Sequence, residues 1–334
     1  MPSREKTVAV CSDMPRVQSD RPAPMKPPRT RRTEAPIAEK REAGVRAWAS
    51  NSPLLKTKHR LILGDARELR GVKPPIHLVV TSPPYWDLKT YDGAAGDRQL
   101  GHIHSRERFL DELDKVWKGC LELLVPGGRL CVVVGDVCRS RRLFGRHLVD
   151  PLHAYIQVRC QALGFDPLTP ILWNKIANAV TEVAGNGSLF LGKPYEPNAI
   201  IKNDTEYILI FRKPGGYRHP TQEQRDLSMI GKDEHRRWFQ QVWSDVPGDL
   251  QRHHPAPFPV EIARRLIGMF SFVGDTILDP FVGVGSTVVA AAEMHRSSIG
   301  VEIEPKYFDL AEQRITKHLP AGATLEHPKN GGLA

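Results

Sequence analysis

The stretch that decides the fold reads Asp279-Pro280-Phe281-Val282-Gly283-Val284-Gly285-Ser286-Thr287. It closes an apolar segment at 276–280 and precedes a segment with helical spacing at 288–295, so it predicts a turn from a buried strand into a helix. Glycines there let the backbone pass close to a ligand, and free N–H groups at the helix start attract a carboxylate or a phosphate. Alone, this turn is a weak signal, because many dinucleotide-binding enzymes have a glycine-rich turn.

Two details near the turn indicate which class of ligand it binds. Gly283 and Gly285 have G-x-G spacing with no third glycine at the dinucleotide position, which disfavours a nucleotide-binding oxidoreductase. Glu302 ends the next predicted strand, where an acidic side chain suits a ribose diol because both hydroxyls can donate to one carboxylate. A structural turn with a surface glutamate is the less favoured interpretation.

Strands and helices alternate outward from this turn, which predicts an α/β fold with a mostly parallel sheet and helices on both faces. Apolar runs predict strands at 59–65, 76–82, 129–136, 168–173, 206–212, 276–280 and 298–303. Apolar residues at helical spacing predict helices at 106–124, 148–163, 259–270, 288–295 and 307–318. A turn is expected at 126–128 and an irregular, basic stretch at 214–251.

The composition of the chain indicates which partners and which cellular location to expect. The 334 residues carry a net charge of +9, which favours a polyanionic partner, with a solvated basic surface as the alternative. Residues 1–52 are rich in Pro, Arg and Lys and predict a disordered basic tail, and 321–334 predicts a flexible tail. The five cysteines form no C-x-x-C pair, and no apolar run reaches membrane-spanning length, so we expect no zinc ribbon, no membrane partner and a cytoplasmic location.

Two separated motifs resemble those of one known family. Residues 279–287 resemble the S-adenosylmethionine (SAM) motif of the DNA amino-methyltransferases, and Ser82-Pro83-Pro84-Tyr85 resembles their catalytic motif. The catalytic motif comes first, which resembles the circularly permuted order of the β group of that family. The resemblance implies a Rossmann-like SAM-dependent methyltransferase domain over 53–320.

The resemblance also implies which residues bind SAM. Glu302 would bind the ribose, and Asp65 would contact the adenine amino group. A cap of a helix at 66–69 is the alternative for Asp65, and the two roles are compatible. Near the methionine end the family pattern places Asp279, Pro280, Phe281, Gly283, Gly285, Ser286 and Thr287, with His254 and Pro255 closing over it. We expect no metal, because no acidic residue or cysteine has ligand spacing to His253 and His254.

The catalytic motif suits attack by an amine. An exocyclic amine on a base is a poor nucleophile, because its lone pair is delocalised into the ring. Ser82 Oγ and the Pro83 carbonyl can accept the amino hydrogens and localise that lone pair, while the two prolines keep the loop stiff. Tyr85 would offer an aromatic face to a base flipped out of the duplex, and Trp86 would extend that wall.

Ser82 also bears on which base is methylated. Serine in the first position resembles enzymes that make N4-methylcytosine, whereas aspartate is commoner in those that make N6-methyladenine. We therefore favour cytosine N4 and keep adenine N6 as the alternative. An RNA methyltransferase and a catalytically inactive DNA-binding protein on the same fold are more distant alternatives.

Double-stranded DNA is the expected partner, with a nucleoid-associated location. Lys89 and Lys175 are candidate DNA contacts beside the base pocket, with a plain surface charge as the alternative for Lys175. Insertions at about 178–203 and 214–252 are candidate recognition regions, the second containing Arg218, Arg236 and Arg237. The sequence leaves open a homodimer and a cognate restriction endonuclease that acts separately.

Overall fold

The structure, a computed structural model, describes residues 52–87, 96–175, 201, 203–248 and 259–327. The tail expected at 1–52 therefore lies outside the described residues except for Ser52, whose hydroxyl caps a short 3-10 helix, η1 (Pro53–Leu55). No helix in the described ranges is long and apolar enough to cross a membrane.

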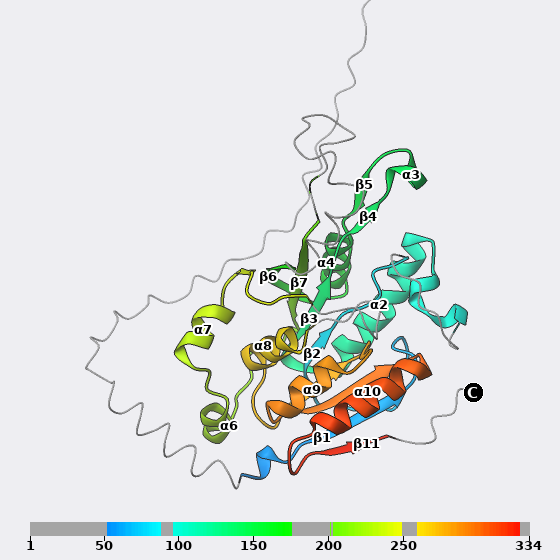
Figure 1. Cartoon of the computed structure of the whole chain (residues 1–334). Coiled ribbons are helices and arrows are strands. Elements are labelled where there is room, and N and C mark those ends of the chain that lie inside the picture. The colour runs from blue at the N-terminus through cyan, green and yellow to red at the C-terminus, as the bar shows by residue number, and fades with distance from the viewer. Residues whose placement is uncertain (1–51, 88–95, 176–200, 202, 249–258, 328–334) are drawn as a thin grey trace, which may run out of the picture. The chain divides into compact units, whose positions relative to one another are not determined.

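A nine-stranded sheet forms the centre of the domain (Figure 1). Its order is β11 (Thr324–Glu326), β1 (Lys58–Leu63), β10 (Ser297–Glu302), β9 (Thr276–Asp279), β2 (Ile76–Thr81), β3 (Leu124–Val134), β7 (Thr205–Arg212), β6 (Asp166–Asn174) and β8 (Val242–Trp243). Only β7 runs against the other strands of this described sheet. The predicted, mostly parallel sheet is confirmed.

Helices cover both faces of the sheet, which explains why its strands read as continuous apolar runs. Leu130, Val132 and Val134 of β3 pack into the core beneath α2 (Arg106–Leu123) and α4 (Leu152–Ala162). The alternating residues Cys131 and Val133 pack into the opposite core, beneath α8 (Val260–Phe270) and α9 (Ser286–Glu293). On that same face, α10 (Pro305–His318) packs against α9 and β1.

Two predicted boundaries are wrong. The turn expected at 126–128 lies inside β3, where the pairing with β2 shifts between Ile76 and Leu78 and Gly127 takes a left-handed φ of 75°. The helix expected from 148 begins only at Leu152, after Pro151. Residues 148–150 instead form β5 (Leu148–Asp150), which pairs with β4 (Val137–Arg139) in a separate hairpin that contains α3 (Arg141–Phe144).

The stretch 214–251, expected to be irregular, is partly ordered. It contains α6 (Gln222–Leu227), α7 (Lys232–Trp238) and β8. Trp238 and Trp243 are 4% and 1% exposed, and the Trp243 indole donates to the Trp238 carbonyl at 2.9 Å. The two helices are too short and polar to show a periodic pattern in the sequence. The segment is held in place by its two buried indoles, because Trp238 packs against Gly268 and Trp243 pairs with Trp173. Within the expected tail 321–334, residues 324–326 form β11.

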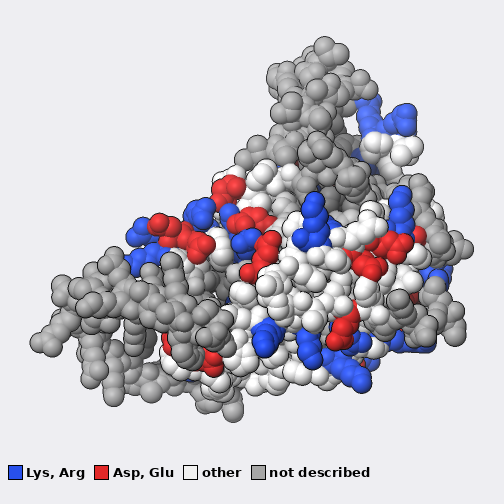
Figure 2. Space-filling view, turned by 60° about the horizontal axis from the view of Figure 1, so that its bottom comes forward, with Lys and Arg blue, Asp and Glu red and all other residues white. Residues whose placement is uncertain are grey.

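Charged side chains are mixed on the face that Figure 2 shows. Lysine and arginine side chains alternate with acidic ones over the described surface there, rather than gathering in one patch. The net charge of +9 therefore does not by itself locate a surface for DNA.

Candidate active site

The two motifs recognised in the sequence meet at the carboxyl edge of the sheet. Thr81 ends β2 and Asp279 ends β9, and these two strands are parallel neighbours. Thr81 Oγ1 donates to Asp279 Oδ1 at 2.7 Å, across 198 residues of sequence. Thr287, at the start of α9, donates from Oγ1 to the Val80 carbonyl at 3.4 Å. The catalytic loop and the glycine-rich turn are therefore held side by side, where ligands bind in open α/β sheets.

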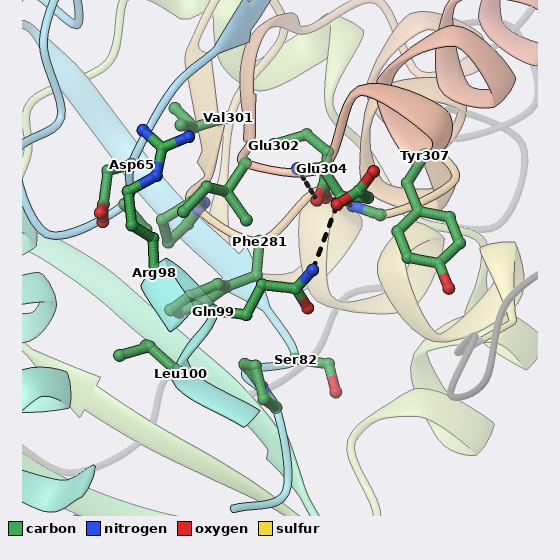
Figure 3. Close-up of a pocket in the computed structure, with 15 residues that line it drawn as sticks. Asp65, Ser82, Arg98, Gln99, Leu100, Phe281, Val301, Glu302, Glu304 and Tyr307 are labelled. Atoms are coloured by element: carbon green, nitrogen blue, oxygen red, sulfur yellow. Dashed lines mark hydrogen bonds between the residues drawn. The ribbon is translucent and has the colours of Figure 1, made fainter. Parts of the chain in front are cut away.

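An open pocket lies at this edge (Figure 3). Seven residues predicted for the site line it: Asp65, Ser82, Pro84, Pro280, Phe281, Gly283 and Glu302. They come from the ends of β1, β2, β9 and β10, and Figure 3 places Ser82 and Glu302 on opposite sides of Gln99. Residues of both sequence motifs therefore line one pocket.

Glu302 is the buried carboxylate of the pocket. Its Oε2 accepts the Gly283 N–H at 2.9 Å and its Oε1 accepts the Glu304 N–H at 3.0 Å. Burial raises the pKa of Glu302 to about 7, against the opposing effect of these two N–H groups. Each oxygen keeps a lone pair, so a vicinal diol can donate to both.

Asp279 holds the turn from below. Its Oδ1 accepts from Thr81 and from the Phe281 N–H at 3.1 Å, whereas its buried Oδ2 has no hydrogen-bond partner among the described residues. Burial raises the pKa of Asp279 to about 6. Gly283 and Gly285 have φ values of 52° and 86°, which side chains with a Cβ rarely adopt. An unpaired carboxylate oxygen under an open turn suits a positively charged ligand such as SAM.

Asp65 caps a turn after β1, whereas the helix considered at 66–69 does not form. Its Oδ1 accepts the Arg67 N–H at 2.9 Å, and its carboxylate also forms a forked ion pair with the Arg67 guanidinium. Arg67 reaches on to Glu112 at 3.0 Å. The carboxylate is thus fixed at the rim of the pocket; its contact with adenine stays a prediction.

One wall of the pocket was missed by the sequence reasoning. It consists of η2 (Gly96–Arg98) and η3 (Leu100–His102), which bring Arg98, Gln99 and Leu100 to the pocket. Gln99 is 5% exposed, and its Nε2 donates to Glu304 Oε2 at 3.1 Å (Figure 3). Two successive 3-10 turns carry no hydrophobic period, so no sequence signal marks this wall.

Behind the catalytic loop lies a chain of polar contacts. Ser82 Oγ donates to Tyr85 Oη over a long 3.4 Å, and Tyr85 Oη donates to Glu206 Oε2 at 3.0 Å. Glu206, at the start of β7, pairs through its other oxygen with Lys175 Nζ. Glu206 was not predicted, because its partners lie 121 and 31 residues away in sequence.

The two predicted aromatic walls are more enclosed than expected. Tyr85 is 8% exposed, and its ring packs so closely on Gly135 that a Cβ there would lie 3.2 Å from Cε2. Trp86 follows with a φ of 52° and donates from its indole to the Ile103 carbonyl at 2.8 Å. The Arg139 guanidinium covers the Trp86 ring at 4.0 Å.

The predicted DNA contacts divide into three groups. Lys175 is 19% exposed and paired with Glu206, so it is neither a free surface charge nor open to a phosphate in this structure. Arg218 pairs with Asp275 at 2.5 and 2.6 Å; Asp275 directly precedes β9, which places Arg218 at the opposite edge of the sheet from the catalytic loop. Arg236 and Arg237 are exposed on α7.

Some predicted site residues do not line the pocket or lie elsewhere. Asp279, Gly285, Ser286 and Thr287 support the pocket from below, and Pro83 and Tyr85 sit behind it. Lys89, His254, Pro255 and nearly all of the recognition region expected at 178–203 lie outside the described residues.

Comparison with known proteins agrees with this geometry. The sequence profile of a DNA methylase family that covers N6 and N4 enzymes matches residues 76–313. The type II methyltransferase M.MjaI of Methanocaldococcus jannaschii is 38% identical over 290 residues, which are 78% of this chain and 92% of that protein. The type II methyltransferase M.MthZI of Methanothermobacter thermautotrophicus is 34% identical over 287 residues, 79% of this chain and 78% of that one.

Solved structures extend the comparison to the cofactor. A Thermus thermophilus protein crystallised in complex with SAM has a TM-score of 0.67 and 51% identity, over 83% of this chain and 100% of its own. The cytosine-N4-specific PvuII DNA methyltransferase has a TM-score of 0.54 at 18% identity, over 78% and 92%, which shows a shared fold. The predicted Rossmann-like fold and the SAM cofactor are confirmed.

Proposed function

The chain belongs to the N6 and N4 DNA methylase family and uses SAM to methylate an exocyclic amino group in DNA, and we propose that this group is N4 of cytosine. The observation that carries the proposal is Ser82, which directly follows β2 and lines the same pocket as Glu302 and Phe281. It brings a hydroxyl, in the position where the adenine enzymes more often have an aspartate, to the edge of the cofactor pocket. Methylation of adenine N6 is the alternative.

Glu302, Asp279 and Asp65 are proposed to hold the cofactor. The Glu302 carboxylate accepts from the ribose hydroxyls, the Asp279 carboxylate faces the positively charged methionine end, and Asp65 accepts from the adenine amino group. Bound there, SAM supplies an electrophilic methyl group. The chain itself supplies orientation and exclusion of water, because these carboxylates are fixed by backbone N–H groups or by arginine before any ligand arrives.

The polarity of the Ser82–Tyr85–Glu206 chain supports direct attack by the amine. Because Tyr85 donates its proton to Glu206, its oxygen can accept from Ser82. Ser82 then directs its own proton to Tyr85 and keeps its lone pairs for the amino hydrogens of the base. Bound SAM would supply the methyl group, and its sulfonium sulfur would keep the electron pair of the carbon–sulfur bond that breaks. The methylated nitrogen must lose one proton, which Ser82 and Tyr85 can pass to the Glu206 carboxylate.

Base flipping and double-stranded DNA complete the proposed function. A target amine inside a duplex cannot reach the pocket unless the nucleotide rotates out of the stack. Since two relatives are named type II methyltransferases, we also propose that the chain acts in a restriction–modification system with a separately acting endonuclease.

Analysis of methylated product tests the proposal. Purified protein is incubated with labelled SAM and with plasmid DNA, and in parallel with total RNA, and the digested nucleosides are identified by mass spectrometry. We expect label in N4-methylcytosine from DNA. Label in N6-methyladenine overturns the choice of base, and label only in RNA overturns the substrate.

A further inference from the structure

The hairpin formed by β4, α3 and β5 stands outside the main sheet. It follows β3 directly at the carboxyl edge, where the catalytic loop also lies, and projects away from the domain (Figure 1). Its strands pair in register from Val137 with Asp150 to Arg139 with Leu148. The sequence reasoning predicted no element here that contacts a substrate.

Apolar side chains cover the outer part of the hairpin. Leu143, Phe144, Leu148 and Val149 are 72%, 46%, 37% and 48% exposed. They are four of the ten large apolar side chains that are exposed in the described part of the chain, gathered within seven residues. Leu148 and Val149 are consecutive in β5, so both faces of the hairpin are open. Clustered exposed apolar groups mark an interaction site more often than single ones do.

The same tip is basic. Arg141, Arg142 and Arg146 are exposed, and within the described ranges none of the three forms an ion pair. A protein partner would have to bring an acidic group to each of these arginines, whereas a nucleic acid supplies a phosphate at every nucleotide. The combination suits a polyanion that also has apolar surface, which is the description of a nucleic acid duplex with its phosphates and stacked bases.

The root of the hairpin is locked to the catalytic loop. Arg139 is 8% exposed and donates to Asp150 and to Asp87, each at 2.7 Å. Its guanidinium also lies over the Trp86 ring at 4.0 Å and over the Phe144 ring at 5.4 Å. Trp86 and Asp87 are the two residues that follow Tyr85. The Arg139 side chain therefore contacts both the hairpin and the segment next to the catalytic loop.

We propose that the hairpin of residues 137–150 is a DNA-contacting wedge, in which the arginines hold phosphates and Leu143 and Phe144 press against the bases beside the target. The inference rests on the proposed function, which requires a base to leave the stack. Apolar side chains inserted at a base step partially unstack it, and this insertion lowers the cost of rotating the target nucleotide outward.

Binding measurements test the arginines. The triple variant Arg141→Ala/Arg142→Ala/Arg146→Ala is compared with Lys56→Ala/Lys118→Ala/Lys317→Ala, which removes three exposed charges elsewhere. We expect the arginine variant alone to lose at least about tenfold in affinity for duplex DNA, and its log–log salt dependence to flatten by about 2.7, or about 0.9 for each phosphate contact. Wild-type affinity and slope in the arginine variant overturn the proposal.

Base rotation tests the tip. Leu143→Ala/Phe144→Ala should bind SAM as the wild type does, but give a smaller fluorescence rise with 2-aminopurine at the target position and a lower kcat. A target position opposite an abasic site should restore kcat, because no pair has to be broken there. If fluorescence and kcat are unchanged in Leu143→Ala/Phe144→Ala, the proposed wedge is wrong. It is also wrong if the variant differs from the wild type only in its oligomeric state, measured by sedimentation. Failure of wild-type protein to methylate DNA sinks the proposed function instead, and the binding comparison still reports on the hairpin.

Discussion

The two halves of the carboxyl edge treat charge differently. On the side proposed for the cofactor, two of the three carboxylates, Glu302 and Asp279, are buried and held by backbone N–H groups and a threonine, and burial raises the pKa of both. On the side proposed for the substrate, charged side chains pair with one another: Glu206 pairs with Lys175, and Arg139 pairs with Asp87 and Asp150. Backbone donors preorganise a site for one small ligand. Side-chain pairs can separate and re-form, which suits the proposed entry of a flipped base.

Loss of the Ser82 hydroxyl should have the largest effect. Ser82→Ala removes one of two acceptors for the amino hydrogens, and we expect methyl transfer to fall about 100-fold or more, as when one polar group of a comparable site is removed. SAM affinity, measured by calorimetry, should stay unchanged, because Ser82 is assigned to the substrate side. A variant that retained near wild-type transfer would remove Ser82 from the mechanism.

Variants of Glu206 and Lys175 should show that Glu206 has a role in catalysis beyond its ion pair with Lys175. Glu206→Gln leaves Lys175 without its partner in a largely buried place, so we expect lower thermal stability and transfer reduced by roughly tenfold or more. Adding Lys175→Met should restore stability without restoring transfer, because the chain from Ser82 through Tyr85 still ends on a neutral group. Recovery of both properties in the double variant would make Glu206 a structural partner of Lys175 and nothing more.

The Glu302 carboxylate should favour SAM binding and disfavour folding stability at high pH. Its folded pKa of about 7 lies above that of an exposed glutamate, so its contribution to stability is complete at low pH and is lost as pH rises through about 7. The amide of Glu302→Gln leaves one of the two backbone N–H groups without an acceptor at every pH, so the variant is compared with itself at two pH values. Between pH 4 and pH 8 the melting temperature of the wild type should fall more than that of Glu302→Gln. It should bind SAM about tenfold more weakly at pH 8, because only the carboxylate accepts from both ribose hydroxyls.

Wild-type SAM affinity at pH 8 in Glu302→Gln would contradict the ribose assignment. A wild-type fall in melting temperature between pH 4 and pH 8 no larger than that of Glu302→Gln would contradict the raised pKa. Calorimetry and a thermal melt at the two pH values check both statements on the same preparation.

Arg218 should have the smallest effect on function. Arg218→Ala leaves the buried Asp275 carboxylate without its forked partner, and we expect a stability loss of about 1–3 kcal/mol. DNA affinity and transfer, measured below the melting transition, should not change, since Arg218 lies at the opposite edge of the sheet. A salt-dependent loss of DNA affinity would restore its predicted role as a phosphate contact.

The sequence predicted those features that depend on local pattern. Apolar runs located the central strands because both faces of the sheet are covered, and the glycine spacing at 283–285 located the turn because its φ values require glycine. The hairpin at 137–150 was missed because the apolar spacing of 148–163 continues across Pro151 and resembles one helix. Glu206 and Gln99 were missed because each acts through a partner more than a hundred residues away.

The hydrogen bond between Thr81 and Asp279 has a consequence for synthesis on the ribosome. The catalytic strand emerges early, whereas its neighbour β9 emerges 198 residues later, near the end of the chain. A nascent or prematurely terminated polypeptide therefore carries the catalytic loop without the turn that holds the methyl donor. A product that ends before β9 therefore lacks the partner of Thr81, and we expect it to be unable to mark DNA.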